Sequence, residues 1–199
     1  MTSDTRRRIL QAAGGLFASR GYTAASMREV AEEAGIGKAT IYHHFPDKQA
    51  IVLTLLELQL LRVKETLGAV EAEPDPRKRF QIAAEQGIAA LLESSDIMQI
   101  VRREVPGGRS RIRAAMVPFL RKNRSLLAEA VREGTRTGIF RAVDPEETAR
   151  VFMTMVQGTF ASVSIGRERP KWARGAASAM LDIFFHGIQG GGRTPKENR

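Results

Sequence analysis

The segment 26–45 constrains the fold of this chain more than any other. It begins with Ser26 and, three positions later, Glu29, which is the S-x-x-E pattern of a capping box. In a capping box the serine hydroxyl accepts a hydrogen bond from a free amide of the first turn, and the glutamate accepts one from the serine amide. Gly35 then allows a sharp turn. The pattern predicts two short helices, from Ser26 to Ala34 and over residues 38–44.

The apolar residues of this segment are spaced so that the two helices pack against each other. The small face of the first helix and the anchors of the second are Val30, Ala31, Ala34, Ile36, Ile41 and Phe45. This packing leaves an outer row that consists of Lys38, Ala39, Thr40, Tyr42, His43 and His44. Small residues let a helix approach the major groove of DNA closely, and the hydroxyl and ring nitrogens offer hydrogen bonds to base edges. The segment therefore predicts a helix-turn-helix that binds double-stranded DNA.

The rest of the chain also favours helices. Alanine, leucine, glutamate and arginine dominate, and no alternating polar and apolar run is long enough to predict a sheet. Besides the two short helices, we expect helices over residues 5–19, 47–70, 76–93, 96–104, 109–133, 144–166 and 170–189. The long helix after Asp47 has an apolar stripe at Ile51, Leu55, Leu58 and Val63.

The predicted fold class is all-α, with a small N-terminal domain and a larger helical bundle. Residues 1–48 form the three-helix DNA-binding domain, and the long helix joins it to a ligand-binding and dimerisation bundle over residues 49–189. Residues 190–199 combine three glycines with polar side chains and lack an apolar stripe, so we expect them to be disordered.

Composition bounds the function classes. The net charge of +9 favours a polyanionic partner, but residues 1–48 hold seven basic and five acidic side chains, so charge alone supports DNA binding weakly. The chain has no cysteine, which excludes disulfides and thiolate metal sites, and we expect a cytoplasmic protein. Arg6–Arg8 precede an apolar run, but helical spacing favours a first helix over a signal peptide. No segment approaches the roughly 18 apolar residues of a membrane span.

An enzyme is the alternative from another functional class. The chain has three histidines, His43, His44 and His186, and two of them lie in the helix-turn-helix. No phosphate-binding glycine loop and no histidine and carboxylate spacing for a metal accompany them. We therefore predict no catalytic residue, no metal site and no cofactor. A helical-bundle enzyme that uses carboxylates stays open as an alternative without support.

Residues 5–56 resemble the TetR family of regulators. The matching features are Ile9, Ala13 and Phe17 of the first helix, Gly21-Tyr22, the helix-turn-helix, and Tyr42-His43-His44-Phe45 followed by Asp47-Lys48. The resemblance implies that Thr40, Tyr42 and His44 contact DNA and that Lys48 binds a phosphate, as the free amides of a helix N-terminus also favour. The predicted DNA-binding residues are Ser26, Met27, Arg28, Gly37, Lys38, Ala39, Thr40, Tyr42, His43, His44 and Lys48. Gly37 departs from the serine or threonine that is frequent there, although glycine is a usable cap.

The resemblance also implies that the region from residue 76 onward binds effectors and dimerises. Two helices are candidates for a four-helix seam between subunits, with faces at Met155, Gly158, Ser162 and Ile165 and at Ala177, Leu181, Phe184 and Ile188. The alternative interpretation is that these are internal core helices. The resulting hypothesis is a homodimeric repressor that a small molecule releases from a palindromic operator. A DNA-binding organiser without any effector is the second hypothesis.

Asn123 suggests where an effector binds, because it interrupts the apolar face of the helix over residues 109–133. A polar group among apolar neighbours is typical of a ligand cavity, although a buried asparagine also satisfies backbone groups. The predicted pocket residues are Met98, Arg102, Met116, Phe119, Asn123, Phe152 and Met155. Basic residues are frequent over residues 102–124 and favour an acidic effector or add attraction to DNA. The sequence does not identify the effector.

Overall fold

The computed structural model describes residues 2–165 and 169–186, and the side chains of residues 4–159 and 175–186. Within these residues every regular element is a helix, and the order is α1 (Thr2–Arg20), α2 (Met27–Glu33), α3 (Lys38–His44), α4 (Lys48–Ala72), α5 (Pro76–Glu104), α6 (Gly108–Arg136), α7 (Pro145–Ile165) and α8 (Arg169–His186). The expected disorder of residues 190–199, and the side chains of Ser162, Ile165 and Ile188, lie outside the described residues. None of the described helices is long and apolar enough to cross a membrane.

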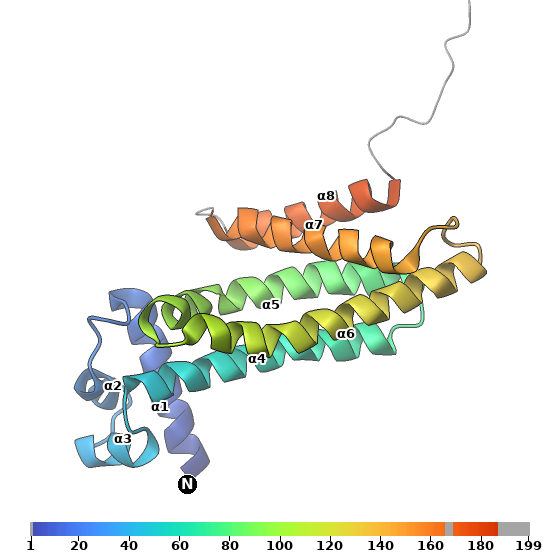
Figure 1. The fold of residues 1–199 in the computed structure, drawn as a ribbon. Helices are drawn as coiled ribbons and strands as arrows, with labels where there is room; N and C mark the ends of the chain where they lie inside the picture. The colour runs from blue at the N-terminus through green and yellow to red at the C-terminus, as the bar shows by residue number, and fades with distance from the viewer. Residues whose placement is uncertain (1, 166–168, 187–199) are drawn as a thin grey trace, which may run out of the picture.

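The helices form two unequal groups. Helices α1, α2 and α3 gather at one end of the molecule, and α4 leads away from them (Figure 1). Helices α4, α5 and α6 run side by side, and the α7–α8 pair packs against α5 and α6 (Figure 1). The predicted all-α arrangement is confirmed: an N-terminal unit of three helices, one long connecting helix and a larger bundle.

Aspartate caps begin three of the long helices where the sequence predicted them. The Asp47 carboxylate accepts a hydrogen bond from the amide of Ala50 at 2.7 Å. Asp75 likewise accepts from the amide of Arg77 at 2.8 Å, and Asp144 from that of Glu147 at 2.7 Å. Because the first amides of a helix have no partner within it, these carboxylates fix where α4, α5 and α7 start.

The structure corrects the predicted break between residues 93 and 96, because α5 is continuous from Pro76 to Glu104. Ser94 and Ser95 lie at the expected break. Their hydroxyls donate to the carbonyls of Ala90 and Leu92 at 2.7 and 2.8 Å, so both serines are accommodated by bonds to the preceding turn. This pair of serines therefore does not end the helix, because the apolar face of α5 is buried both before and after the pair in the sequence.

The buried stripe of α4 also differs from the predicted one. Ile51 and Val63 are buried, but Leu58 is 46% exposed. The buried positions follow Val52, Leu56 and Leu60, one residue every helical turn. Leu58 lies half a turn away from these positions, on the opposite face of the helix.

Two clusters of buried side chains hold the fold together. The first core cluster joins α1, α2 and α3 to the first part of α4 and to residues of α5 and α6, among them Met98, Val101 and Phe119. The second core cluster joins the end of α4 to α5, α6, α7 and α8 around Phe80 and Phe152. The three N-terminal helices therefore share one continuous core with the larger bundle.

Candidate nucleic-acid interface

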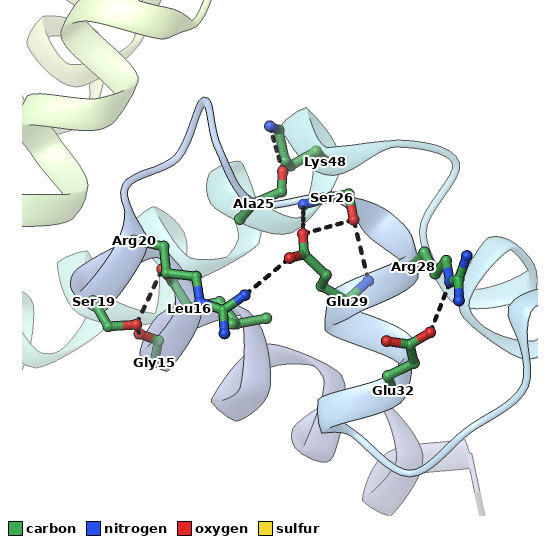
Figure 2. A network of polar contacts seen from close by, with 10 residues as sticks. All are labelled: Gly15, Leu16, Ser19, Arg20, Ala25, Ser26, Arg28, Glu29, Glu32 and Lys48. Carbon is green, nitrogen blue, oxygen red and sulfur yellow. Dashed lines mark hydrogen bonds and ion pairs between the residues drawn. The ribbon is translucent and has the colours of Figure 1, made fainter.

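The predicted capping box is present at the start of α2 (Figure 2). The Ser26 hydroxyl accepts a hydrogen bond from the amide of Glu29 at 3.2 Å, and the Glu29 carboxylate accepts from the amide and the hydroxyl of Ser26, both at 2.8 Å. These hydrogen bonds hold the pKa of the Glu29 carboxyl below its ordinary value, so the box is intact at neutral pH. Arg20, at the end of α1, pairs with the same carboxylate at 2.9 Å and ties α1 to α2.

The turn between α2 and α3 depends on Gly35 and on Arg8. Gly35 has φ +62°, a left-handed conformation that glycine adopts without a steric penalty. The Arg8 guanidinium donates to the carbonyls of Ala34 and Gly35 at 2.5 and 3.2 Å. These carbonyls follow the last turn of α2, where a cation is favourable. Sequence reasoning missed Arg8, whose only signal was its place in a basic run on α1.

Buried anchors set the orientation of α3. Ile41 is fully buried and Phe45 is 2% exposed, and both belong to the first core cluster. Arg6 also lies over the ring of Phe45, with 4.5 Å between its guanidinium carbon and the ring centroid. With its inner face fixed in this way, α3 presents the opposite face outward.

The outer row of α3 lies where the sequence predicted it. Lys38, Ala39, Thr40, Tyr42 and His43 are exposed, whereas His44 is half-buried and contacts the ring of His43. The backbone of Gly37 caps the helix by accepting hydrogen bonds from the amides of Thr40 and Ile41. Among the remaining candidates, Ser26 and Arg28 are exposed and Met27 is half-buried, and Arg28 pairs with Glu32 at 2.7 Å. The structure brings these residues to one end of the molecule, and their contacts with DNA stay a prediction.

Lys48 has contacts that the sequence did not indicate. Its ammonium donates to the carbonyls of Tyr22, Thr23 and Ala25 at 2.6, 3.3 and 2.7 Å, and it lies 4.4 Å from the centroid of the Tyr22 ring. Figure 2 shows the bond to Ala25. Because an ammonium has three protons to donate, these carbonyls engage all of them. Lys48 therefore holds the α1–α2 loop against α4, and its phosphate role stays a prediction.

Replacement of Lys48 by methionine separates the two roles. Loss of bonds from a charged donor to three carbonyls is expected to lower the free energy of unfolding by about 1.5–3 kcal/mol. Loss of one phosphate contact is expected to reduce the slope of log K against log salt concentration by about 0.9. Urea denaturation measures the first quantity, and operator titrations at several salt concentrations measure the second. If the salt slope did not change, Lys48 would hold the α1–α2 loop but would not bind a phosphate.

A contact with the larger bundle also holds the α1–α2 loop in place. The hydroxyl of Thr23 donates to the carboxylate of Glu104, at the end of α5, at 3.3 Å. Tyr22 packs on Phe17 with 5.2 Å between ring centroids. Burial, followed by the charges of Asp47 and Glu104, raises the pKa of Tyr22 above its ordinary value, so this phenol stays neutral. The loop that precedes α2 thus contacts both α4 and α5.

The predicted pocket residues fall into both core clusters. Met98 and Phe119 are buried in the first core cluster, with Met116 packed against it, whereas Phe152 is buried in the second, with Met155 packed against it. Arg102 is exposed. Asn123 is 5% exposed, and among the described residues its side-chain oxygen has no hydrogen-bond partner. Their role in ligand binding stays a prediction.

Comparison with known proteins agrees with this architecture. Residues 9–55 match the family described as "Bacterial regulatory proteins, tetR family". The HTH-type transcriptional regulator YvkB of Bacillus subtilis is 28% identical over 158 residues, which are 78% of this chain and 81% of YvkB. The TetR family regulator PfmR of Thermus thermophilus superposes with a TM-score of 0.65 at 25% identity, over 92% of this chain and 97% of PfmR.

The names of other similar proteins report different regulatory roles and ligands. FasR of Mycolicibacterium smegmatis, an activator, is 35% identical over 83 residues, 41% of this chain and 38% of FasR. AcnR of Corynebacterium efficiens, a repressor, is 36% identical over 65 residues, 33% of this chain and 35% of AcnR. AibR, solved with isovaleryl coenzyme A and operator DNA, has a TM-score of 0.60 at 24% identity over 91% of this chain and 98% of AibR.

A small helix-turn-helix unit joined by a long helix to an α-helical bundle is the architecture of the DNA-binding transcription regulators to which this chain is similar. Both the matched segment and the arrangement of the helices are those of one group of such regulators. Residues 9–55 match the TetR family of bacterial regulators, and the whole chain has the fold of TetR family transcriptional regulators.

Proposed function

We propose that this regulator is a cytoplasmic homodimer that represses transcription from a palindromic operator and is released from it by a small molecule. The observation that carries the proposal is the exposed row of α3 above its buried anchors Ile41 and Phe45. A short recognition helix reads only a few base pairs, so two copies related by a two-fold axis are needed to specify a site. A repressor that is bound to its operator in this way blocks transcription from the DNA segment that it covers.

The outer faces of α7 and α8 support the dimer. Exposed residues recur along α8 at Gly175, Ser178, Ala179 and Asp182, and α7 exposes Thr154 and Gly158. Small side chains on adjacent antiparallel helices allow a second pair of helices to approach closely. Ala177 and Leu181, which the sequence placed in the seam, are 1% and 6% exposed and belong to the second core cluster. For these two residues the alternative interpretation, as internal core, is correct.

Selection from random double-stranded oligonucleotides tests the operator and the dimer together. We expect the selected sites to contain an inverted repeat, and sedimentation to give a dimer at micromolar protein concentration. Ala179→Arg places a charge in the proposed seam and is expected to give a folded monomer with weakened operator binding. A wild-type monomer that binds single half-sites tightly would contradict the proposal.

Asn123 supports an effector site between α5, α6 and α7. A buried side-chain oxygen without a partner is costly, and a ligand group that donates to it would remove this cost. Phe119, one helical turn away on α6, belongs to the first core cluster, which also contains the anchors of α3. A ligand that displaces α6 therefore disturbs the packing beneath the DNA-binding helices. A coupling of about 1–3 kcal/mol would weaken operator binding by roughly 5- to 150-fold.

Asn123→Leu tests this site. Replacement of an unpaired polar group by an apolar one of similar size is expected to leave stability equal or higher by about 1 kcal/mol, while the response to the effector is lost. Gln59→Leu is the matched control, because Gln59 on α4 also has an unpaired side-chain oxygen but was not predicted to bind ligand. A thermal-shift screen that starts from isovaleryl coenzyme A, the compound bound to AibR, supplies the probe.

The screen also decides between the two hypotheses. If a compound raises the melting temperature and releases the operator, the regulator responds to an effector. If a broad metabolite library yields no such compound, the protein is a DNA-binding organiser whose bundle serves assembly. An Asn123→Leu protein that responds like the wild type would place the site elsewhere.

A further inference from the structure

A groove of about 650 Å³ lies at the end of the molecule opposite the helix-turn-helix. Its lining residues come from the start of α5, the end of α6, the loop between α6 and α7, the first half of α7 and the end of α8. Figure 1 shows where these segments lie. Its volume is within the range of small-molecule sites. None of the residues expected at the effector site lines it except Met155.

The floor of the groove is aromatic and is held in a fixed arrangement. Phe80 is fully buried and contacts the rings of Phe140, Phe184 and Phe185, with centroids 6.1, 5.2 and 6.0 Å away. Phe140 and Phe185 are themselves nearly parallel, 6.1 Å apart. Rings that fix one another in this way offer apolar area without a cost in side-chain ordering when a ligand binds.

Gly134, in the last turns of α6, makes room for this floor. The amide of Phe140 donates to the carbonyl of Gly134 at 2.9 Å, which brings the Phe140 ring onto the helix. A Cβ at position 134 would lie 2.2 Å from a carbon of that ring. The position of Phe140 in the groove therefore requires glycine at this point.

The rim of the groove is basic. Arg77 and Arg141 line it, both are exposed, and among the described side chains neither has an ion-pair partner. Arg77 lies 5.8 Å from the centroid of the Phe185 ring. The acidic residue of the wall, Glu147, is already paired with Arg150 on its own helix. The groove thus combines an apolar floor with two guanidinium groups that are free to bind an anion.

We propose that this groove binds small carboxylates with an aromatic or branched apolar body. The apolar body would lie on the phenylalanine floor, and Ile139 of the α6–α7 loop, which is 38% exposed, would flank it. The carboxylate would accept hydrogen bonds from Arg77 and Arg141, since guanidinium and carboxylate groups match in geometry and charge. The groove contains Met155, which was also predicted at the effector site, but it does not contain Asn123, and the proposal does not depend on that site.

Calorimetry with 4-phenylbutyrate, and with 4-phenylbutyramide as its uncharged counterpart, tests the site in the full-length protein. We expect the acid to bind, and the double variant Arg77→Gln, Arg141→Gln to bind it at least about 10-fold more weakly, with little change in the binding of the amide. Arg136→Gln is the matched control. Arg136 is an exposed arginine at the C-terminal end of α6, and it does not line the groove.

Two further variants test the location. Gly134→Ala displaces the Phe140 ring, and Ile139→Trp fills the groove from an exposed position in the α6–α7 loop, outside the proposed dimer seam. Both are expected to abolish binding of 4-phenylbutyrate. The proposal is overturned if the acid does not bind the wild type, if the acid and the amide bind equally, or if both variants bind normally.

Discussion

Gly108→Ala is expected to lower the free energy of unfolding by about 3 kcal/mol or more. Gly108 begins α6 directly after the turn from α5. A Cβ at this position would lie 1.9 Å from the carbonyl oxygen of Val101 and 2.7 Å from its carbonyl carbon. These are backbone atoms of α5, so no side-chain rotation relieves the clash, and the two helices would have to separate.

Two other glycines provide controls. Gly107, the preceding residue, has φ +68° but open space where a Cβ would lie, so alanine there is expected to cost only about 1–2 kcal/mol of backbone strain. Gly87 is buried within α5 and also has space, so alanine is expected to stabilise the helix by about 0.5–1 kcal/mol. Urea denaturation at one fixed protein concentration ranks the three variants. A loss at position 108 no larger than the loss at position 107 would mean that the contact with Val101 does not set the cost.

The turn at Gly108 also bears on DNA binding. Val101 and Val105, which precede it, are buried in the first core cluster together with the anchors of α2 and α3. Glu104, in the same turn of α5, accepts the hydrogen bond from Thr23 in the α1–α2 loop. Separation of α5 from α6 would therefore loosen the support beneath the helix-turn-helix.

The sequence predicted those features that depend on neighbouring residues. The capping box of Ser26 and Glu29 and the aspartate caps of the long helices are local signals, and each appears where it was expected. The outward row of α3 follows from the buried spacing of Ile41 and Phe45. The same reasoning failed at Ser94 and Ser95, because burial of α5 on both sides outweighs the weak tendency of serine to interrupt a helix.

Contacts between distant segments could not be predicted in this way. Arg8 bonds to carbonyls 26 and 27 positions away, and Lys48 to carbonyls 23 to 26 positions before it. Both side chains are long and flexible, and their partners are backbone atoms that carry no residue-specific signal. The aromatic groove requires the start of α5 and the end of α8 to meet, which the sequence pattern does not reveal.

Phe45→Ala and Tyr42→Ala are expected to have opposite signatures although the residues lie three positions apart. Phe45 is 2% exposed in the first core cluster, so its truncation is expected to cost about 3–5 kcal/mol of unfolding free energy. Tyr42 is 46% exposed on the outer row of α3, so its truncation is expected to change stability by no more than about 0.5 kcal/mol.

Operator binding completes the comparison. With the operator recovered by selection, Tyr42→Ala is expected to lose at least about 10-fold in affinity, which corresponds to about 1.4 kcal/mol. Phe45→Ala is expected to lose binding only in proportion to the loss of folded protein, which circular dichroism measures in the same samples. Fluorescence anisotropy with labelled operator gives the affinities. If Tyr42→Ala kept full affinity for the operator, the outer row of α3 would not be the surface that reads DNA, because its exposed large apolar side chain would make no contact there.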